Sequence, residues 1–320
     1  GDVGEDIVQE IIVNIWLFYS AYQFTDVLTS FSVGAGNTER DSMINRIAPL
    51  VPVYDISFQY MVWDTPAAFT VEPIQVAPGE PPRQTSMLGR NETDTLQGYA
   101  LTDSIPDILL GVNKEKAQAI LLAHAKFLES KFVTSYEYQR AKLIESQVPA
   151  ASGYGDWDNA QKNPVTDLNN AIRTINATAG KMPNTIVFGS NAWARLRENP
   201  LAQKLVSFNS VGMFDESLLQ IALFTRMKEI FVNTMPFYDP TGQGKTMMED
   251  DVYILYKEDS PTQFDASAIK TFALNGQSQR EVTTEYFPTD KLTKVTNRVY
   301  SLTKLTNPGA IIRINTASAD

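Results

Sequence analysis

An α+β fold is predicted for this chain of 320 residues from three features of its sequence. Residues 103–145 place apolar side chains at the spacing of one long helix. Residues 163–200 give a second pattern, in which a helix, a short apolar strand and another helix follow one another. Residues 261–320 alternate threonine, valine and tyrosine with charged residues, which is typical of antiparallel strands with one solvated face.

Size and composition limit the possible classes of protein. The chain is long enough to bury the core of one large or two ordinary domains, and 43% hydrophobic with 20% charged residues is typical of a folded protein. The absence of cysteine excludes disulfides and thiolate metal sites, and the single histidine, His124, excludes a histidine-cluster metal site. A net charge of −10 argues against tight binding of nucleic acid phosphates by the chain as a whole.

Residues 1–53 open with an apolar, aromatic-rich segment between Ile7 and Tyr22, whose spacing predicts a helix buried on several sides. It is either an ordinary core helix or an N-terminal arm that lies on a neighbouring subunit. Its most apolar part, residues 11–22, is shorter than the roughly 20 residues that a membrane span needs. We therefore expect no membrane partner.

Residues 54–101 mix aromatic and β-branched residues in a strand pattern on either side of a turn, APGEPP. Pro81 and Pro82 exclude a helix there because they lack backbone donors and fix φ. We predict a long two-stranded hairpin that ends near Leu101. An isolated hairpin is only marginally stable in water, so it should lie on its own domain or on another subunit.

Residues 102–150 are predicted to hold a helix of about 45 Å, capped by Asp103 and Ser104 or restarted at Asn113. His124 is expected to pack in its buried stripe rather than to act in catalysis. The predicted stripe consists of Ala117, Leu121, His124, Leu128, Phe132 and Ser135.

Residues 151–260 contain the most specific local signals. Asn163-Pro164 begins a helix that Gly180 ends, and Gly189 begins another that ends near Asn199-Pro200. Another apolar helix precedes Arg226. Further strands are predicted at residues 185–188, 229–232, 251–257, 268–274, 280–286, 296–302 and 310–315, the last four beside the long helix.

No constellation of catalytic, cofactor-binding or metal-binding residues emerges, so we do not expect an enzyme. TGQGKT at residues 241–246 lacks the earlier glycine of a phosphate-binding loop, since Asp239 stands there. The carboxylate run at residues 248–251 is more simply a solvated loop than a pore lining or a divalent-ion site. Serine nucleophiles would have only His124 as a base, and no G-x-S-x-G motif surrounds any serine.

The order and spacing of one block resemble the central part of tailed-phage major capsid proteins of the Hong Kong 97-like fold. The residues that carry the resemblance are Trp157, Asn163-Pro164, Asp167-Leu168, Ala171, Ile175, Gly180, Pro183-Asn184, Gly189, Ala192-Trp193, Leu196 and Asn199-Pro200.

The resemblance implies an N-terminal arm at 1–53, an extended hairpin loop at 54–101, a peripheral domain with a long spine helix at 102–150 and 261–320, and an axial domain at 151–260. It implies self-assembly of hexamers and pentamers into an icosahedral shell around a double-stranded DNA genome, assembled in the host cytoplasm. Portal, scaffold and decoration proteins would be the other partners, and the packaged DNA would lie at the inner face without sequence-specific binding. Some relatives join subunits through a loop lysine; this loop has none, so we expect no such crosslink.

Six residues are predicted to contact neighbouring subunits. Near the hairpin tip they are Arg83, Arg90 and Glu92, and in the axial block they are Trp157, Arg195 and Arg197. Two other readings stay open: an encapsulin-like shell of a cellular nanocompartment, and an unrelated soluble enzyme. Small shells loaded with a cargo protein would indicate the first, and a compact, catalytically active monomer would indicate the second.

Overall fold

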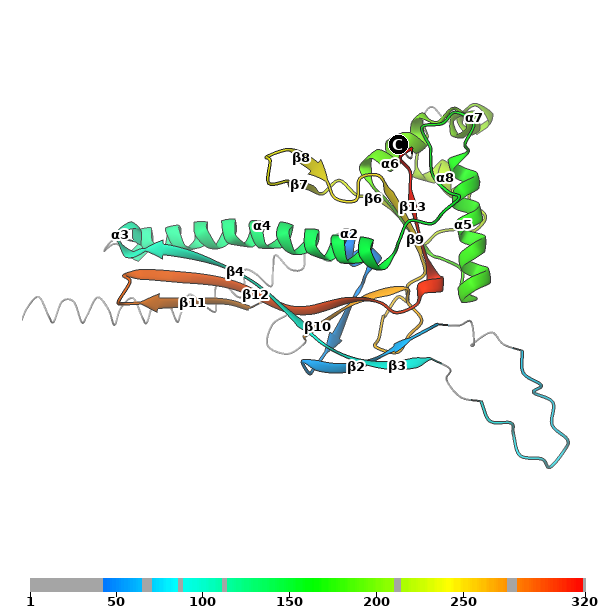
Figure 1. Ribbon diagram of the computed structural model, residues 1–320, viewed down its shortest axis with the longest axis horizontal. Coiled ribbons are helices and arrows are strands. Elements are labelled where there is room, and N and C mark those ends of the chain that lie inside the picture. Colours follow the sequence, from blue (N-terminus) through cyan, green and yellow to red (C-terminus); the bar gives the residue numbers. More distant parts are fainter. Residues whose placement is uncertain are drawn as a thin grey trace, which may run out of the picture.

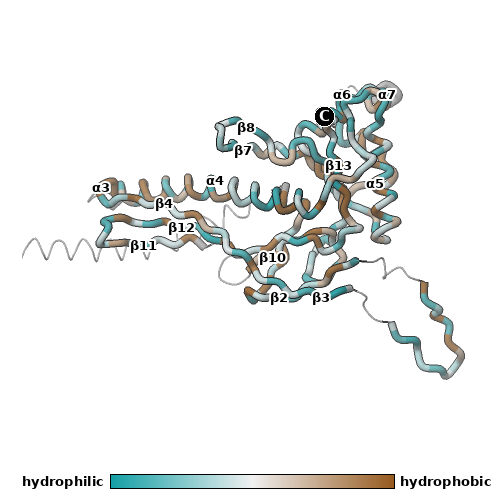
Figure 2. The backbone as a smooth tube through the Cα atoms, in the orientation of Figure 1, coloured by the Kyte–Doolittle hydropathy of each residue, from teal (hydrophilic) through white to brown (hydrophobic). Residues whose placement is uncertain are grey.

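The computed structural model describes residues 43–64, 71–85, 89–110, 114–209, 214–274 and 281–318. The helix predicted at residues 7–22 lies outside these ranges. Figure 1 shows a long wing, in which one helix runs along a sheet, joined to a compact lobe of helices around a second sheet. The hydropathy of the chain follows this division, because apolar residues recur along the inner side of the wing and through the lobe (Figure 2).

The wing is a sheet covered by α4, Lys114–Gln147, whose 34 residues extend about 51 Å. The central strand is β12, Leu292–Leu305, which pairs antiparallel with three strands. These are β4 (Gln97–Pro106), β10 (Ile269–Leu274) and β11 (Glu281–Phe287), and β10 also pairs in parallel with β1 (Leu50–Val53).

The structure corrects the start of the predicted helix. Residues 103–106 belong to β4, a one-turn helix α3 follows at Asp107–Leu110, and the long helix begins at Lys114. Pairing with β12 explains the difference, because the register places Asp103 opposite Val295 and so gives these backbone groups ladder partners that a helix cap would not provide.

The buried face of α4 packs on β4, β11 and β12 through Ala117, Leu121, Ala125, Leu128, Phe132 and Tyr136. Two predicted members of the stripe are not buried. Ser135 is exposed, and His124 is half-buried with its Nδ1 2.6 Å from Oδ2 of Asp103. His124 therefore packs at the edge of the stripe rather than within it, and its ring bridges the helix to β4.

The lobe is built around a second sheet with the order β13-β9-β5-β6. Its strands are β5 (Thr185–Phe188), β6 (Glu229–Val232), β9 (Asp251–Leu255) and β13 (Ile311–Asn315). Along β9 the side chains alternate: Val252 and Ile254 face one apolar cluster, and Tyr253 and Leu255 face another. The sheet is thus covered on both faces, which explains why β9 reads as an unbroken apolar run.

One face of this sheet carries α5 (Pro164–Ala179), α6 (Ser190–Glu198) and α8 (Glu216–Ala222), with α7 (Pro200–Asn209) beside them. The predicted boundaries of α5 are confirmed. Asn163 caps its N-terminus by accepting from the Val165 N–H, and Gly180 ends it at φ 64°. That left-handed conformation carries no steric penalty in glycine.

Two predicted placements differ in the structure. β13 was expected beside the long helix, but it pairs with β9 in the lobe. Met43–Ile47 (α2) and β1, both within the range predicted as an N-terminal arm, pack into the body: α2 joins the core beneath the lobe sheet, and β1 joins the wing sheet. The remaining elements are a short hairpin of β7 (Pro236–Tyr238) and β8 (Gly244–Thr246), and a single 3₁₀ turn, Pro308–Ala310.

Helix α2 is held against the lobe by Glu229 of β6. The Glu229 carboxylate accepts from the Lys257 ammonium at 2.8 Å and from the Arg46 guanidinium, and Arg46 also lies over the ring of Phe231. Burial alone would raise the pKa of Glu229, but the hydrogen bonds and charges of Lys257 and Arg46 outweigh it and lower this pKa below its ordinary 4.5.

Replacing Glu229 by glutamine should therefore change how stability depends on pH. A carboxyl group with a lower pKa in the folded than in the unfolded chain stabilises the fold above pH 4.5, and this contribution is lost as the pH falls through the lowered value. We expect Glu229→Gln to lower the free energy of unfolding at pH 7, and the gap between the two proteins to shrink below pH 4.5. Urea unfolding from pH 7 to pH 3 measures this, and a gap that stays constant on acidification would contradict it.

Candidate interaction surface

Residues 71–85, which we call the projecting loop, extend away from the lobe as a chain without helix or strand (Figure 1). Every residue in it is exposed, including Val71 at 94% and Ile74 at 88%. Among the described residues, the hydrogen bonds of the loop join loop residues to one another, as from the Thr85 hydroxyl to Glu72 at 3.2 Å. Large apolar side chains exposed to water, with no partner among the described residues, make this loop a candidate interaction site.

The tip of the projecting loop is a tight turn. The N–H of Glu80 donates to the carbonyl of Ala77 at 3.0 Å, and the Glu80 carboxylate accepts in return from the Ala77 N–H. Gly79, with φ at 92°, supplies the left-handed residue of this turn. The turn predicted from APGEPP is confirmed.

The predicted length of the hairpin is wrong. Among the described residues of the hairpin, pairing is restricted to β2, Ser57–Val62, and β3, Arg90–Thr95, at the root of the loop. Residues 97–101, predicted to extend the second strand, instead belong to β4 and pair with β12. The projecting loop is therefore an open loop rather than the end of a continuous ladder.

Polar side chains link the two root strands to each other and to the wing. The Tyr60 hydroxyl lies 2.9 Å from carboxylate oxygens of both Glu92 and Asp94 on β3. Burial and these two carboxylates raise the pKa of Tyr60. Asp94 also pairs with Lys304 of β12 at 2.8 Å. Burial would raise the pKa of Asp94, but the hydrogen bonds from Lys304 and Tyr60 prevail and lower it.

The three contact residues predicted on the hairpin lie in two different environments. Arg83 is on the projecting loop and is exposed. Arg90 and Glu92 lie on β3, where the Arg90 guanidinium pairs with Glu92 at 2.7 Å and with Asp64 at 3.6 Å. The structure thus separates Arg83, which is available to a partner, from two residues that already pair within their own chain.

Trp157, which was predicted as a contact, is 1% exposed in the core of the lobe, and its contact role stays a prediction. Its indole N–H donates to Asp167 at 2.9 Å, and its carbonyl accepts from Asn199. The Arg195 guanidinium forms ion pairs within the lobe, with Asp158 at 3.0 Å and with Asp250 at 2.5 Å. Arg197 is half-buried at the end of α6, where its carbonyl accepts from Gln203. These residues stabilise the lobe in this structure.

A second exposed apolar surface lies at the far end of the wing, and the sequence reasoning missed it. It consists of Ile108 and Leu109 on α3, at 89% and 51% exposure. Phe127, which is 64% exposed part-way along α4, is a separate exposed side chain outside the predicted stripe. Figure 1 places α3 and the projecting loop at opposite ends of the molecule. One copy therefore cannot bring its own two exposed apolar surfaces together.

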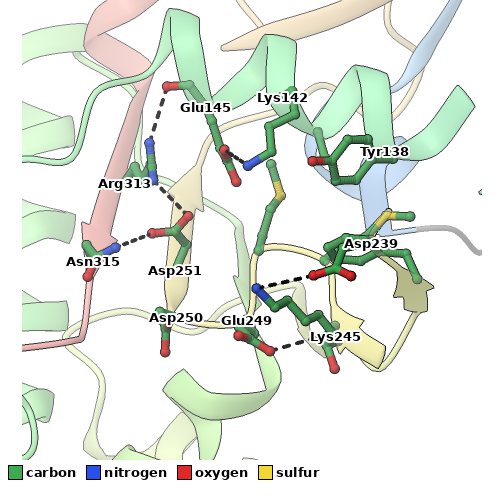
Figure 3. Close-up of a pocket in the computed structure, with 15 residues that line it drawn as sticks. Tyr138, Lys142, Glu145, Asp239, Lys245, Glu249, Asp250, Asp251, Arg313 and Asn315 are labelled. Carbon is green, nitrogen blue, oxygen red and sulfur yellow. Dashed lines mark hydrogen bonds and ion pairs between the residues drawn. The ribbon is translucent and has the colours of Figure 1, made fainter. Parts of the chain in front are cut away.

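A cavity of about 390 Å³ lies between α4, the β7–β8 hairpin and the ends of β9 and β13 (Figure 3). Its central side chain is Arg313, which pairs with Asp251 at 3.0 Å and donates to the carbonyls of Glu145 and Val148. A cation at the last carbonyls of a helix satisfies groups that lack intrahelical partners and complements the helix dipole. Arg313 thus joins the end of the wing helix to the lobe sheet.

The carboxylates around this cavity are used structurally. Asp250 pairs with Arg195, Asp251 with Arg313, and the Asp239 carboxylate accepts from the backbone of Thr241 and Gln243 within its turn. Burial raises the pKa of Asp251, and the Arg313 charge only partly offsets this. Within the described ranges, no three His, Cys, Asp or Glu side chains are placed to hold a metal ion. No helix in these ranges combines the length and apolar character of a membrane span.

This arrangement of helices and strands is similar to that of several solved structures. Neither a protein-family model nor a curated protein sequence matches the chain. A phage-related protein from Bordetella bronchiseptica RB50 is 14% identical, with a TM-score of 0.66 over 91% of this chain and 97% of its own. A virus-like particle from Pyrococcus furiosus is 13% identical, with a TM-score of 0.50 over 91% and 99% of the two chains.

The capsid of cyanophage P-SCSP1u is similar in the same way, with 10% identity and a TM-score of 0.50 over 85% of this chain and 87% of its own. At such identities the shared property is the fold. The chain therefore has a mixed helix-and-sheet fold found in phage capsid proteins, over nearly its whole length.

Proposed function

We propose that this chain, which has a fold of phage capsid proteins, is the major capsid protein of a tailed double-stranded DNA phage, of the Hong Kong 97-like architecture. The observation that carries the proposal is the projecting loop, whose apolar side chains have no partner among the described residues of the same copy. In this proposal the wing is the peripheral domain, α4 is its spine helix and the lobe is the axial domain. The projecting loop and its root are the extended loop, and residues before α2 are the N-terminal arm.

The placement of the exposed surfaces at opposite ends of the molecule favours contacts between different surfaces of successive copies. A contact between different surfaces of successive copies is heterologous, and it generates a ring when the rotation closes. The projecting loop lies at one end of the molecule and its exposed apolar counterpart on α3 at the other (Figure 1). Each large apolar side chain that such a contact fully buries contributes about 1.5–3 kcal/mol. Hexamers and pentamers that close into an icosahedral shell are the proposed assembly.

The proposed biology follows from this role. The protein would act as a structural homo-oligomer in the virion capsid, assembled in the host cytoplasm with portal and scaffold proteins and with decoration proteins where the shell carries them. Packaged DNA would lie against its inner face without sequence-specific contacts, in keeping with a net charge of −10. The absence of lysine from residues 54–101 supports a shell without loop crosslinks.

A nanocompartment shell is the second candidate, because the fold is also found in a virus-like particle from Pyrococcus furiosus and so is not restricted to phage capsids. Such a shell would enclose a cargo protein in place of a genome. An enzyme is not proposed, because the sequence carries none of the catalytic motifs considered above and the fold is one found in a phage capsid.

Sedimentation of the purified protein, followed by electron microscopy of the fast fraction, tests the proposal. Closed shells of uniform size are expected, and a 35.6 kDa monomer at every concentration would overturn the assembly role. Particles formed during infection or prophage induction should contain DNA and a portal, whereas protein cargo without a portal would establish the nanocompartment instead.

Removing the apolar side chains of the projecting loop should abolish assembly without unfolding the subunit. Val71→Ser with Ile74→Ser deletes the two most exposed apolar groups of the loop. The free energy of unfolding should change by less than about 0.5 kcal/mol, because exposed positions contribute little to the fold. Sedimentation should show loss of the shell fraction, and circular dichroism should show an unchanged fold.

Ile221→Ser is the matched control, since Ile221 on α8 is 74% exposed and lies away from the projecting loop. It should assemble as the parent does. Normal shells from the loop variant would show that the projecting loop is not an assembly contact.

A further inference from the structure

Among the described residues, the hydrogen bonds of the projecting loop stay within the loop, so the contacts that connect it to the body are those of its root. Three backbone or indole donors tie the end of β2 to the wing. The N–H of Trp63 donates to the carbonyl of Thr306 at 2.7 Å, and that of Met61 to Gln263 at 3.1 Å. The indole N–H of Trp63 donates to the carbonyl of Asp265 at 3.0 Å.

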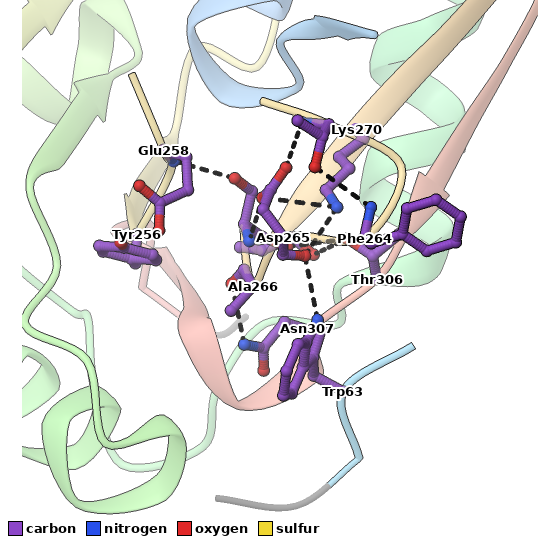
Figure 4. A network of polar contacts seen from close by, with 12 residues as sticks. Trp63, Tyr256, Glu258, Phe264, Asp265, Ala266, Lys270, Thr306 and Asn307 are labelled. Atoms are coloured by element: carbon purple, nitrogen blue, oxygen red, sulfur yellow. Dashed lines mark hydrogen bonds and ion pairs between the residues drawn. The ribbon is translucent and has the colours of Figure 1, made fainter. Parts of the chain in front are cut away.

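The carbonyl of Asp265 has a second donor, and this donor is a buried charge. The Lys270 ammonium lies 2.7 Å from the same carbonyl and 3.4 Å from the Asp265 carboxylate, and the Lys270 side chain is 0% exposed (Figure 4). Lys270 reaches this position from β10, in the centre of the wing. Burying an ammonium is costly unless it is paired, so its position beneath the root calls for a specific role.

The surface loop that carries Asp265 is fixed around this pair. The Asp265 carboxylate accepts from the N–H groups of Ser267, at 2.7 Å, and Thr262. The Asn307 side chain donates to the carbonyl of Ala266 at 3.0 Å. Hydrogen bonds of the Asp265 side chain and of the Ala266 carbonyl therefore hold this loop in place. The Asp265 carbonyl is a fixed acceptor for the Trp63 indole (Figure 4).

We propose that Lys270, Asp265 and Trp63 form a root anchor, which sets the direction of the projecting loop and thereby positions it for a second copy of the chain. Lys270 acts through the Asp265 carbonyl and is a positioning residue, since it does not itself touch the projecting loop. The inference depends on the proposed function only for its effect on assembly. The geometry of the anchor can be tested on the subunit alone.

The test is a distance measurement between the projecting loop and the wing helix. The chain has no cysteine, so Gln75→Cys and Ser130→Cys place two nitroxide labels without background. Both positions are exposed, one on the projecting loop and one on α4. Pulsed electron–electron double resonance, with labelled protein diluted in excess unlabelled protein, then gives the distance distribution within one copy.

We expect a single narrow distribution in the parent, and a broadened and shifted one in Trp63→Phe, which keeps an aromatic ring but loses the indole donor. Lys270→Met, which replaces the ammonium by an unbranched apolar side chain, should broaden it similarly. The double variant should give a distribution little broader than that of either single variant, because both changes remove the same anchor. Trp193→Phe, a tryptophan change in the lobe, should leave the distribution unchanged.

A distribution in Trp63→Phe as narrow and as centred as that of the parent would overturn the proposal, and so would a broad distribution in the parent itself. Trp63→Phe decides the question even where Lys270→Met does not fold. Failure of the parent to form shells would remove the proposed function while leaving these distances to test the anchor. If the parent forms shells and gives a narrow distance distribution, Trp63→Phe and Lys270→Met should lower the yield of closed shells. Alternatively, they should increase the spread of shell diameters relative to Trp193→Phe.

Discussion

Arg140→Ala should destabilise the protein by about 3–5 kcal/mol, as expected when one partner of a buried ion pair is removed. Arg140 is 1% exposed on α4, and its guanidinium donates to Glu137 at 2.9 Å, Thr271 at 2.8 Å and Asn45 at 3.0 Å. One side chain thus connects the wing helix to β10 and to α2. Its loss removes the guanidinium that pairs with the Glu137 carboxylate, which is also 1% exposed.

Urea unfolding at protein concentrations below assembly measures this loss, because assembly would otherwise add to the apparent stability. Lys142→Ala is the matched control on the same helix: Lys142 also pairs with an acid three residues away, Glu145, but is 55% exposed. It should cost about 0–1 kcal/mol. Replacing Arg140 and Glu137 together by methionine should recover part of the loss, since no isolated charge remains. Equal effects of the two single changes would show that burial does not determine the contribution of Arg140.

Trp157→Ala should cost about 3–5 kcal/mol, the range for removing a large aromatic side chain from a packed core. Trp157 lies among Leu168, Ile172 and Leu196 in the lobe, and its indole donates to Asp167. Thermal or urea unfolding of the unassembled subunit measures the change. This prediction separates a core role from the contact role first expected, because a surface contact would lower assembly and leave the stability of the subunit intact.

Tyr238→Ala is the control for removing an aromatic side chain, since Tyr238 is 77% exposed on the β7–β8 hairpin. Its free energy of unfolding should stay within about 0.5 kcal/mol of the parent. Trp157→Phe should lower the free energy of unfolding by less than Trp157→Ala does, and it should still form shells. If Trp157→Ala leaves the free energy of unfolding unchanged but abolishes assembly, Trp157 acts as a contact between subunits.

The elements predicted well are those whose signals are local in sequence. Asn163-Pro164 and Gly180 bound α5 because a side-chain cap, a proline in the first turn and a left-handed glycine act within a few residues. The strand of β9 was predictable from its apolar run. The turn at the tip of the projecting loop followed from glycine and proline chemistry alone.

The errors share another cause, which is that a contact between distant residues overrides a local pattern. Residues 103–106 include plausible helix caps, but antiparallel pairing with β12 makes them part of strand β4. The internal partners of Arg195 and Trp157 were likewise not predicted, while their contact role stays a prediction. Phe127 is outside the buried stripe of α4, and only the completed wing shows that nothing described covers it.

By itself the sequence determined the α+β class, the central helix–strand–helix block with its caps, and the absence of thiol and histidine-cluster chemistry, because these depend on composition and on neighbours in the chain. The tertiary structure alone decided which sheet receives β13, where β4 pairs, and which cations are already neutralised. It also showed that the projecting loop is exposed throughout, while Trp63 at its root is bonded to Asp265. The physical reason is that strand register and ion pairing join residues far apart in sequence, and no local pattern encodes those distances.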